Sequence, residues 1–297
     1  MRRAAAALLA LALAAGAAAA APLRLVSWNA EWLADAAGLQ AAGFWSGCTP
    51  MPGLPPCDAY RRRGIEDANG YEARKLAPVR QTLRELADAG MDVLALQEVQ
   101  NAQVLRAVLP GGYRIACITS RRSAQNLAFV VRESARLAPA CRELPALGLE
   151  ADSAPHALRR GLELSVSAGG QRVVLLNVHL KSGCAAGRLD TGRAACGTLQ
   201  QQLQVLDDWT HGQDAQRSAY AVLGDWNRRL DGGTPLASLS FVEVDRRAAW
   251  RSCHRDVDHL ALGDTLRKRM GAAQARLLPR PDGASDHCPL WAELPLH

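Results

Sequence analysis

From Leu23 onward the chain repeatedly places a short apolar run directly before a polar residue that can take part in catalysis. The runs are rich in Leu and β-branched residues and have the length of buried β-strands. They read LRLVSW, DVLALQ, NLAFVV, LELSV, RVVLLNV, AYAVL and VDHLAL. Two further segments, Arg74 to Ala89 and Thr198 to Trp209, place apolar residues at helical spacing. Gly43 to Gly70, rich in Gly, Pro and Arg, and Leu144 to Arg160 are expected to be surface loops. Strands with helices between them predict an α/β or α+β fold.

The polar residues at the ends of these runs are of the types found in catalytic and metal sites. They are Asn29, Glu31, Glu98, His179, Asp225, Asn227, Asp258, Asp286 and His287. Neighbouring strands deliver their terminal residues to a common rim of a sheet, so side chains placed there can converge. One such residue would carry little information, because strand ends are usually polar. Repetition over six segments predicts one shared polar site.

The N-terminal residues have the composition of a secretory signal peptide. Arg2 and Arg3 precede an Ala- and Leu-rich stretch that ends in small residues suited to cleavage. We therefore expect a signal peptide at 1–21, a mature domain at 22–297 and a secreted or periplasmic protein, with a retained membrane anchor as the alternative. No later stretch is apolar for long enough to predict a transmembrane segment, and nothing implies a stable protein partner.

The chain is basic, with a formal net charge of +6 that falls to about +4 without Arg2 and Arg3. Lys75, Lys181 and Lys268 are its only lysines, so most of the positive charge comes from arginine. Arginine binds phosphate in a bidentate way, and a basic surface attracts polyanions. An Ala- and Arg-rich composition is equally expected from genome bias. The charge therefore indicates association with anions and says little about chemistry.

Eight cysteines in an exported chain predict disulfides. The pairs that the sequence suggests are Cys48 with Cys57, Cys117 with Cys141, Cys184 with Cys196 and, by elimination, Cys253 with Cys288. Other connectivities stay open at this point. Zinc is the alternative, because Cys253-His254 and His287-Cys288 are two Cys/His pairs. Neither pair has the ligand spacing typical of zinc sites.

Six short motifs together carry a family resemblance. They are WN, LQEV, NVHLKS, LGDWN, VDHL and SDHCPL, in this order between Leu23 and Leu294. Each is weak alone, but the ordered set resembles the endonuclease/exonuclease/phosphatase family, which includes DNase I, exonuclease III, bacterial sphingomyelinases and inositol-phosphate 5-phosphatases. The resemblance implies a four-layer α/β sandwich, in which two packed β-sheets are flanked by helices. It also implies a metal-dependent hydrolase that acts on phosphate esters.

The resemblance implies a metal site. Glu98 would be the chief Mg²⁺ ligand, Asn29 would help to hold the metal or the phosphate, and Asp286 would complete the site, with Mn²⁺ or Ca²⁺ as alternatives. Mg²⁺ prefers carboxylate and amide oxygens and keeps several waters, so this small set of protein ligands suffices. For Glu98 the alternative is an ordinary carboxylate at a strand end, and for Asp286 it is a turn residue.

Catalytic roles follow from the same resemblance. Asp225 and Asn227 would position the nucleophilic water and the phosphate. His287, oriented by Asp258, would be the general base or a group that polarises the phosphate, and His179 would bind or protonate phosphoryl oxygens. A histidine paired with a carboxylate is held in one tautomer and can exchange a proton near neutral pH. Structural histidines and an Asp/Asn turn are the alternatives.

Two departures from the family pattern are visible. The usual GDFN motif is GDWN here, which changes only the aromatic residue between the polar pair. The family's phosphate-contacting Tyr or second carboxylate, between the Glu and the first His segments, has no clear counterpart. Gln125-Asn126 is the nearest polar pair, and it is left unassigned.

Substrate must be argued from residues around the expected site. Lys181 and Arg228 are the expected phosphate contacts, and Arg121-Arg122 and Arg229 are further basic positions, although solvated surface arginines are an equal alternative. DNA or RNA is the expected substrate. A phosphatase or a sphingomyelinase-like enzyme is the alternative, but an aromatic content of 5% gives no sign of a membrane-docking surface. An inactive binding protein is a third possibility, which intact polar positions disfavour.

Overall fold

The computed structural model describes residues 22–41, 43–49, 54–120, 123–149, 158–168, 170–230, 236, 238–249, 253, 256–270 and 274–294. The expected signal peptide at 1–21 and the basic pair Arg121-Arg122 lie outside these ranges. Within them, no helix has both the length and the apolar character needed to cross a bilayer.

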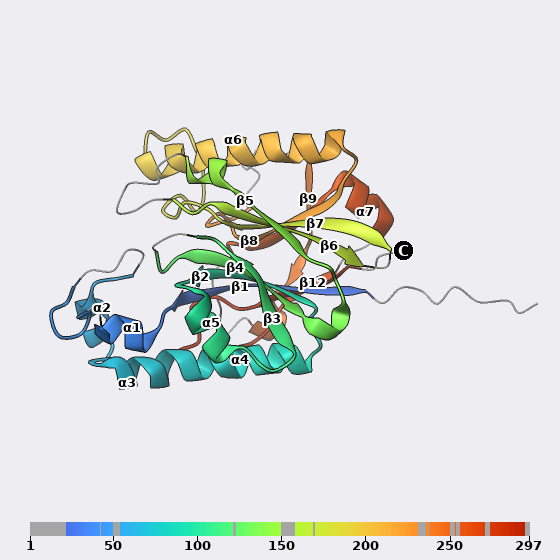
Figure 1. The fold of residues 1–297 in the computed structure, drawn as a ribbon. Helices are drawn as coiled ribbons and strands as arrows, with labels where there is room; N and C mark the ends of the chain where they lie inside the picture. The colour runs from blue at the N-terminus through green and yellow to red at the C-terminus, as the bar shows by residue number, and fades with distance from the viewer. Residues whose placement is uncertain are drawn as a thin grey trace, which may run out of the picture.

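Two β-sheets form the middle of the molecule (Figure 1). The first has the order β10-β12-β13-β1-β2-β4-β3, and the second has the order β5-β6-β7-β8-β11-β9. The strands of the first sheet are β1 (Leu23–Leu33), β2 (Val93–Val99), β3 (Tyr113–Ile118), β4 (Asn126–Arg132), β10 (Val244–Asp245), β12 (Gln274–Leu277) and β13 (Leu290–Leu294). Those of the second are β5 (Ala140–Leu144), β6 (Gly161–Ala168), β7 (Gln171–His179), β8 (Ala219–Asp225), β9 (Leu239–Phe241) and β11 (Asp258–Gly263). All seven strands predicted from apolar runs are present.

Helices cover the outer faces of both sheets, α4 and α5 on the first and α6 on the second (Figure 1). The helices are α1 (Ala36–Ala41), α2 (Cys57–Arg61), α3 (Ala68–Tyr71), α4 (Ala77–Asp88), α5 (Ala102–Val108), α6 (Ala194–Ala215) and α7 (Asp264–Met270). A π-helical turn, η1 (Glu72–Leu76), leads into α4, and short 3₁₀ turns are η2 (Glu133–Ala135), η3 (Pro145–Gly148) and η4 (Arg247–Ala249). The four-layer sandwich is therefore confirmed, and α4 and α6 are the two helices predicted.

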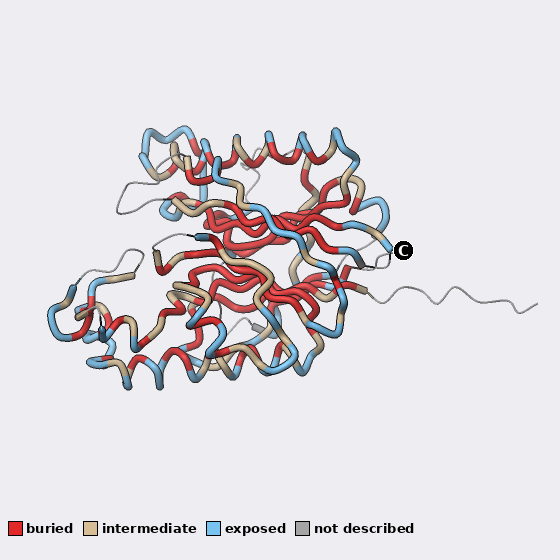
Figure 2. Tube along the Cα trace, in the orientation of Figure 1, coloured by how far each residue is buried: buried red, intermediate tan, exposed pale blue. Residues whose placement is uncertain are grey.

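The central strands are buried on both faces, as Figure 2 shows. Every residue of β2 and β8 is buried, because the partner sheet covers one face and helices cover the other. Phe129 and Leu175 fill the space between the sheets, whereas Leu83 of α4 and Leu203 of α6 pack on the outer faces. Double-sided burial explains why these strands read as continuous apolar runs. Most polar side chains of the central strands consequently lie near strand ends, and the few inside, such as Gln97 and Asn177, are hydrogen-bonded to each other.

The segment between Gly43 and Gly70, expected from its Gly and Pro content to be a surface loop, is partly folded. It contains α2 and most of α3, and it buries Phe44, Trp45 and Tyr60. These rings contact one another edge to face at centroid distances of 5.0–5.9 Å, an arrangement that the charge distribution of aromatic rings favours. The loop expectation is therefore wrong for this part of the chain. The Gly and Pro residues of this segment predict turns, but its aromatic residues pack together into a small core.

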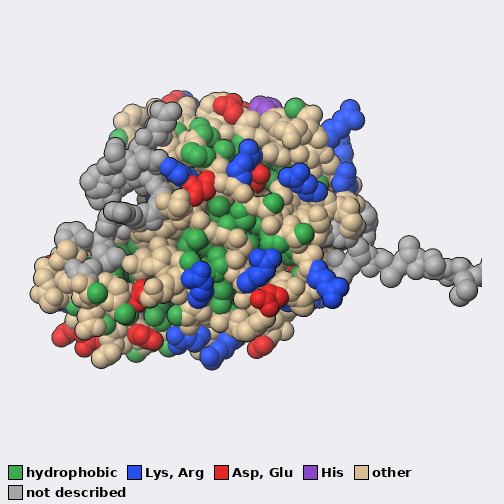
Figure 3. All heavy atoms as spheres, viewed as in Figure 1, with side chains coloured by type: hydrophobic (Ala, Val, Ile, Leu, Met, Phe, Trp, Pro, Cys, Tyr) green, Lys and Arg blue, Asp and Glu red, His purple; other side chains and the backbone are tan. Residues whose placement is uncertain are grey.

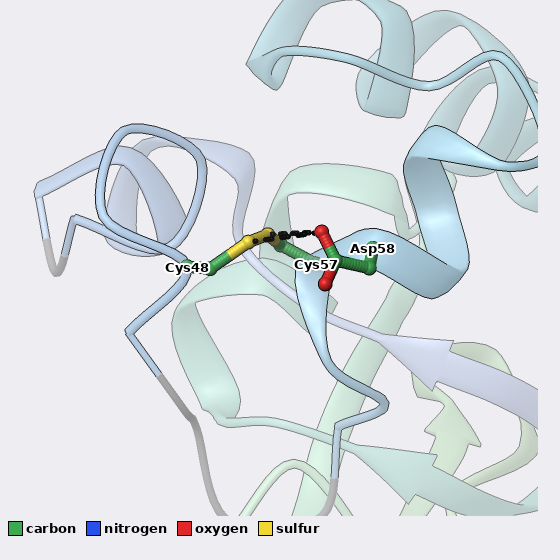
Figure 4. Close-up of side chains that lie close together, drawn as sticks. All are labelled: Cys48, Cys57 and Asp58. Atoms are coloured by element: carbon green, nitrogen blue, oxygen red, sulfur yellow. Dashed lines mark hydrogen bonds between the residues drawn. A yellow bond between two sulfur atoms is a disulfide. The ribbon is translucent and has the colours of Figure 1, made fainter.

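All eight cysteines are paired, in the four disulfides expected. Figure 4 shows one of them, Cys48–Cys57, beside the carboxylate of Asp58. A cysteine binds metal as its thiolate, and sulfurs bonded to each other have no thiolate to offer. The Cys48, Cys57 and Asp58 group is therefore no metal site. The Cys253–Cys288 bond excludes the zinc alternative for the same reason.

The Cys184–Cys196 disulfide closes the segment between β7 and α6. We expect replacement of both cysteines by Ser to reduce the free energy of unfolding by up to about 3 kcal/mol, because the open chain gains entropy when it unfolds. The carbonyl of Cys184 also accepts a hydrogen bond from Arg228, so loss of the disulfide could disturb the site. A raised KM would show such a local effect, and an unchanged KM would show that the disulfide only stabilises the fold. Thermal unfolding and steady-state kinetics would be measured together. An unchanged melting temperature would contradict the expectation.

Candidate active site

The expected site residues meet at one end of the two sheets. They come from β1 at the point where its register shifts, from the ends of β2, β7 and β8, from the start of β11 and from the turn before β13. Six of them are almost completely buried, and they are Asn29, Glu98, His179, Asp225, Asp258 and His287. Burial of so many ionisable groups is costly unless they are paired or bind a ligand. The structure therefore brings together the residues that six separate motifs nominated.

Asn29 joins the two sheets at the centre of this cluster. Its Nδ2 donates to Glu98 Oε1 at 3.3 Å and to Asp225 Oδ2 at 3.0 Å. Its Oδ1 accepts the backbone N–H of Glu31 at 2.9 Å, which fixes the amide orientation because a backbone nitrogen can only donate. In this orientation Asn29 holds two carboxylates in place through its amide nitrogen.

The backbone around Glu98 is irregular, and this irregularity aims the side chain. The β2–β4 register shifts between Leu96 and Val99, and Glu98 has a φ of 59°. Its Oε2 accepts the backbone N–H of Trp32 at 3.0 Å, and Trp32 itself has a φ of 56°. Bulges and left-handed non-glycine residues cost energy and are concentrated at functional sites. Such a carboxylate is held in a defined place.

Asp225 and His179 lie side by side because β7 and β8 run parallel with these residues in register. His179 Nε2 is 3.5 Å from Asp225 Oδ2 and 3.6 Å from Glu98 Oε1. Asn227, with a φ of 51°, donates its backbone N–H to Asp225 Oδ1 at 2.8 Å and its Nδ2 to Leu180 O at 3.0 Å. The GDWN motif is thus a tight turn that fixes Asp225 from both sides.

Gly224, which precedes Asp225, has a φ of 141°, and a Cβ atom there would lie 2.0 Å from the carbonyl oxygen of Val178. We expect Gly224→Ala to lower the free energy of unfolding by about 3 kcal/mol, since a backbone atom cannot move aside without separating β7 from β8. Chemical denaturation would measure the loss. Gly212→Ala is the matched control, because Gly212 is an exposed residue of α6 with open space around it. There the same change should be neutral or stabilising.

His287 forms a dyad with Asp258. Its Nδ1 lies 2.7 Å from Asp258 Oδ2, and its Nε2 faces Asp225 Oδ2 at 3.8 Å and Asp286 Oδ1 at 3.6 Å. Ser285 supports the turn, because its hydroxyl donates to Asn29 O at 2.7 Å and accepts the His287 N–H at 2.9 Å. Asp286 is more exposed than the other site residues and lies at the rim.

The two histidines have opposite protonation tendencies. Burial lowers the pKa of His287, but the carboxylates of Asp258 and Asp225 outweigh it and raise that pKa to about 10. Burial, with positive Arg159 and His287 nearby, holds the pKa of His179 well below its usual value. At neutral pH His287 is therefore an imidazolium that carries a proton on each ring nitrogen, and His179 is a neutral imidazole. Acid and base functions are commonly separated in this way.

Glu98 and Asp225 have the character of cation ligands. Burial raises the pKa of each carboxyl, and a neighbouring negative charge adds to the rise, Asp225 for Glu98 and Asp258 for Asp225. The Asn29 amide nitrogen binds both without supplying a formal charge. A hard divalent cation such as Mg²⁺ prefers carboxylate oxygens and would stabilise both in their ionised form. The donor set therefore fits a divalent metal. Side-chain atoms of Asp225, Asp258 and His287 also cluster within 4.8 Å, but His287 supplies the positive charge there.

The two expected substrate contacts have different positions. Lys181 is partly exposed two residues after His179, and its Nζ donates to Ser182 O at 2.9 Å. Arg228 is 1% exposed, and its guanidinium donates to the carbonyls of Cys184 and Gly187 at 3.3 and 2.6 Å. Its expected role is corrected, because a side chain buried in this way supports a loop and does not face a substrate. His259 is likewise structural, with Nε2 2.8 Å from Arg228 O.

Several supporting residues escaped the sequence reasoning. Gln97 Nε2 donates to Asn177 Oδ1 at 2.8 Å, and Asn177 Nδ2 donates to Leu96 O at 2.9 Å, so a buried amide pair links the sheets behind the site. A buried cation, Lys75, lies 3.4 Å from Glu31. The signal for the amide pair was a polar residue inside each apolar run. Lys75 gave no signal, because its position within a helical pattern resembles any surface lysine.

No family model and no curated protein matches the chain. Solved structures do match it. Zebrafish (D. rerio) TDP2, complexed with single-strand DNA product, is 19% identical with a TM-score of 0.53, covering 92% of this chain and 98% of that one. The human Nocturnin catalytic domain with bound sulfate anion is 14% identical, with a TM-score of 0.53 and coverages of 92% and 93%.

A family member from Leptotrichia buccalis, named as an endonuclease/exonuclease/phosphatase protein, is 12% identical with a TM-score of 0.51. Its match covers 91% of this chain and 98% of that one. At such low identities the likeness concerns the fold. The two packed sheets, their flanking helices and these neighbours agree with the resemblance carried by the six motifs. The chain therefore has the DNase I-like fold of the endonuclease/exonuclease/phosphatase family.

Proposed function

We propose that this chain is an exported, metal-dependent phosphodiesterase that hydrolyses nucleic acid. The observation that carries the proposal is the buried cluster in which Asn29 holds Glu98 and Asp225 beside the His287–Asp258 dyad. It contains cation ligands, a candidate base and a positively charged donor in one place. Hydrolysis of a phosphodiester needs these functions together, because the attacking water must lose a proton while negative charge builds on the phosphoryl oxygens.

Each residue has a defined task in this mechanism. Asp225, held by Asn29 and Asn227, accepts a proton from the attacking water. The His287 imidazolium, oriented by Asp258, donates to a phosphoryl oxygen, and the neutral His179 binds a second oxygen through Nε2–H. The new bond joins the water oxygen to phosphorus, and the bond that breaks joins phosphorus to the leaving oxygen. The leaving oxygen takes up a proton from solvent, and Asp225 returns its proton to solvent. Lys181 contacts the nucleic-acid strand at the rim of the site.

A divalent cation held by Glu98 and Asp225, with Asp286 at the rim, would supply Lewis-acid stabilisation of the phosphoryl oxygens when bound. Mg²⁺ is the proposed ion, and Mn²⁺ and Ca²⁺ share its preference for oxygen ligands. The fit rests on the raised pKa of two buried carboxylates.

Nucleic acid is favoured over lipid by two observations. One structural neighbour, TDP2, is complexed with single-strand DNA product, and this chain is basic. On the face seen in Figure 3, Lys and Arg side chains are spread among acidic ones and form no single band. Among the residues that the structure describes, Leu230 is the only large hydrophobic side chain that is exposed. A lipid-docking phosphodiesterase would need several.

The expected signal peptide and four disulfides support export.

A substrate panel tests the proposed function. Plasmid DNA, single-stranded DNA, RNA, sphingomyelin and bis(p-nitrophenyl) phosphate would each be incubated with Mg²⁺ and with EDTA. We expect Mg²⁺-dependent cleavage of at least one nucleic acid and its loss in EDTA. Turnover of sphingomyelin alone would favour the lipid alternative. Inactivity on every substrate would favour a binding protein that has lost catalysis.

Nucleic-acid binding should weaken as salt rises, because each neutralised phosphate releases condensed counterions. We expect the affinity for an uncleavable phosphorothioate oligonucleotide to fall by about tenfold or more between roughly 50 and 200 mM salt. Fluorescence anisotropy would measure the slope. An affinity that stays constant over this range would contradict a polyanionic substrate.

A further inference from the structure

A recess lies beside the proposed active site, lined by residues from the end of β1 and from the segment that carries α2 and α3. Its volume is about 200 Å³, and its lining includes Trp32, Tyr60, Tyr71, Glu31, Arg63 and Arg74. None of these side chains has a task in the mechanism above. We call this recess the aromatic pocket.

The aromatic pocket adjoins the proposed metal ligand directly. The same Trp32 that lines it donates its backbone N–H to Glu98 Oε2 at 3.0 Å. The neighbouring residue, Glu31, donates its N–H to Asn29 at 2.9 Å. A group bound in this pocket therefore lies next to whatever phosphate occupies the site. That places it on the nucleotide beside the bond that is cut.

The volume and the lining residues of the aromatic pocket determine which chemical group it can bind. Pockets for drug-sized ligands have volumes of about 300–1,000 Å³, so this pocket accepts a single ring system and not a complete nucleotide. Trp32 and Tyr60 lie edge to face with centroids 6.3 Å apart, and Tyr60 and Tyr71 with centroids 5.7 Å apart. Trp32 is only partly buried, so part of its indole is available to a ligand. Flat aromatic groups are the natural partners of such a surface.

The Tyr60 hydroxyl indicates which polar atoms the ligand must carry. The side chain is 5% exposed, and its hydroxyl has no hydrogen-bond partner within the described part of the chain. A buried hydroxyl without a partner is costly, and a ligand that accepts its hydrogen bond removes this cost. The Tyr71 hydroxyl differs, because it donates to Trp32 O at 2.6 Å and keeps the pocket wall in place. The ligand should therefore be a ring that carries hydrogen-bond acceptors.

Charge at the mouth indicates what is attached to that ring. Arg63 and Arg74 are exposed there, and Lys75 lies below them at 3.4 Å from Glu31. Arg63 also lies 3.7 Å from Glu31, so two cations contact one carboxylate, and Arg74 donates to Arg63 O at 2.8 Å. The mouth is positive, which suits a phosphate on either side of the ring. A ring with acceptors, attached to phosphates, is a nucleobase in a nucleic-acid strand.

We propose that the aromatic pocket is a subsite that takes up one unpaired nucleobase next to the scissile phosphate, an inference that rests on the proposed nuclease function. Trp32 stacks on the base, Tyr60 donates a hydrogen bond to it, and Arg63 with Arg74 binds the flanking backbone. The enzyme is therefore selective for single-stranded or locally unpaired strands, because a base inside a duplex cannot enter without unstacking. The subsite does not depend on base identity, since every base has a π-face.

Two single-stranded substrates of equal length and charge test this subsite. One is oligothymidylate, and the other has tetrahydrofuran in place of every base, so both present the same phosphates to the site. We expect wild-type kcat/KM in Mg²⁺ to be about tenfold or more higher for the base-containing strand. Trp32→Ala should bring this ratio close to one, and Tyr60→Phe should reduce it in part. Tyr113→Phe is the matched control, because it removes a hydroxyl that donates to Met91 O in a different part of the fold.

Binding gives a readout that does not require turnover. In EDTA, an oligonucleotide with a single 2-aminopurine should lose fluorescence on binding to the wild type through stacking, and should keep it with Trp32→Ala. Equal wild-type rates on both substrates, or a ratio that survives in both Trp32→Ala and Tyr60→Phe, would overturn the subsite while the nuclease function stands. Absence of Mg²⁺-dependent cleavage of either strand would instead refute the proposed function, and the quenching would still report on the pocket.

Discussion

Glu98→Gln is expected to lower kcat/KM for phosphodiester hydrolysis about thousandfold, because loss of the metal's contribution of several kcal/mol corresponds to that factor. The substitution keeps the size of the side chain and one acceptor oxygen, but it replaces the other oxygen by an amide NH2 and removes the negative charge that would hold the cation. Steady-state kinetics at rising Mg²⁺ would measure the effect. Partial recovery at high Mg²⁺ would show that metal affinity, and not substrate affinity, was lost.

The same variant gives an independent result in stability. Burial raises the pKa of Glu98, so the ionised carboxylate is destabilising when no cation is present. We expect the melting temperature of Glu98→Gln in EDTA to equal or exceed that of the wild type, while Mg²⁺ should stabilise only the wild type. Glu133→Gln, at an exposed position, is the matched control and should change neither property. Near-normal turnover of Glu98→Gln at low Mg²⁺ would remove Glu98 from the metal site.

Asp258→Asn is expected to lower kcat by about 10²- to 10⁴-fold, since it removes the carboxylate that orients and charges His287. Asp258 Oδ2 lies 2.7 Å from His287 Nδ1, so the two side chains are in direct contact. The amide oxygen of Asn could accept the same hydrogen bond, but it would not supply the negative charge. Substrate contacts do not involve Asp258, so KM should change little. Asp264→Asn, at an exposed surface ion pair, is the control. A variant with unchanged kcat would show that His287 does not depend on this partner.

The pH dependence of stability tests the same dyad without any substrate. The folded pKa of His287, about 10, lies above its ordinary value of 6.5. Its contribution to stability is therefore fully present below pH 6.5 and is lost as the pH rises through 10. The difference in unfolding free energy between wild type and Asp258→Asn, in EDTA, should shrink across this window. Lys75 titrates in the same range in both proteins, so its effect cancels. A difference independent of pH would contradict the raised pKa.

Sequence reasoning located the site because the fold buries its strands on both faces. A strand covered by a sheet and by helices holds polar groups inside only where they are paired, so most catalytic residues stand out near the ends of apolar runs. Asn29, Glu98, His179 and Asp225 were all visible in this way. Arg228 misled the reasoning, since a charged residue next to a catalytic motif looks like a substrate contact, and only its burial revealed the carbonyls that it binds.

The sequence by itself determined the alternation of strands and helices and the set of strand-end residues, because periodicity and residue type are local properties. It suggested the cysteine pairs but left other connectivities open, and the fold decided them. The tertiary structure determined the contacts between residues that are far apart in the sequence. It placed Asn29 between Glu98 and Asp225, it gave His287 and His179 opposite protonation states, and it folded a Gly- and Pro-containing segment into an aromatic pocket. Hydrogen bonds, burial and electrostatic fields depend on residues that meet only in the fold, and no local pattern encodes them.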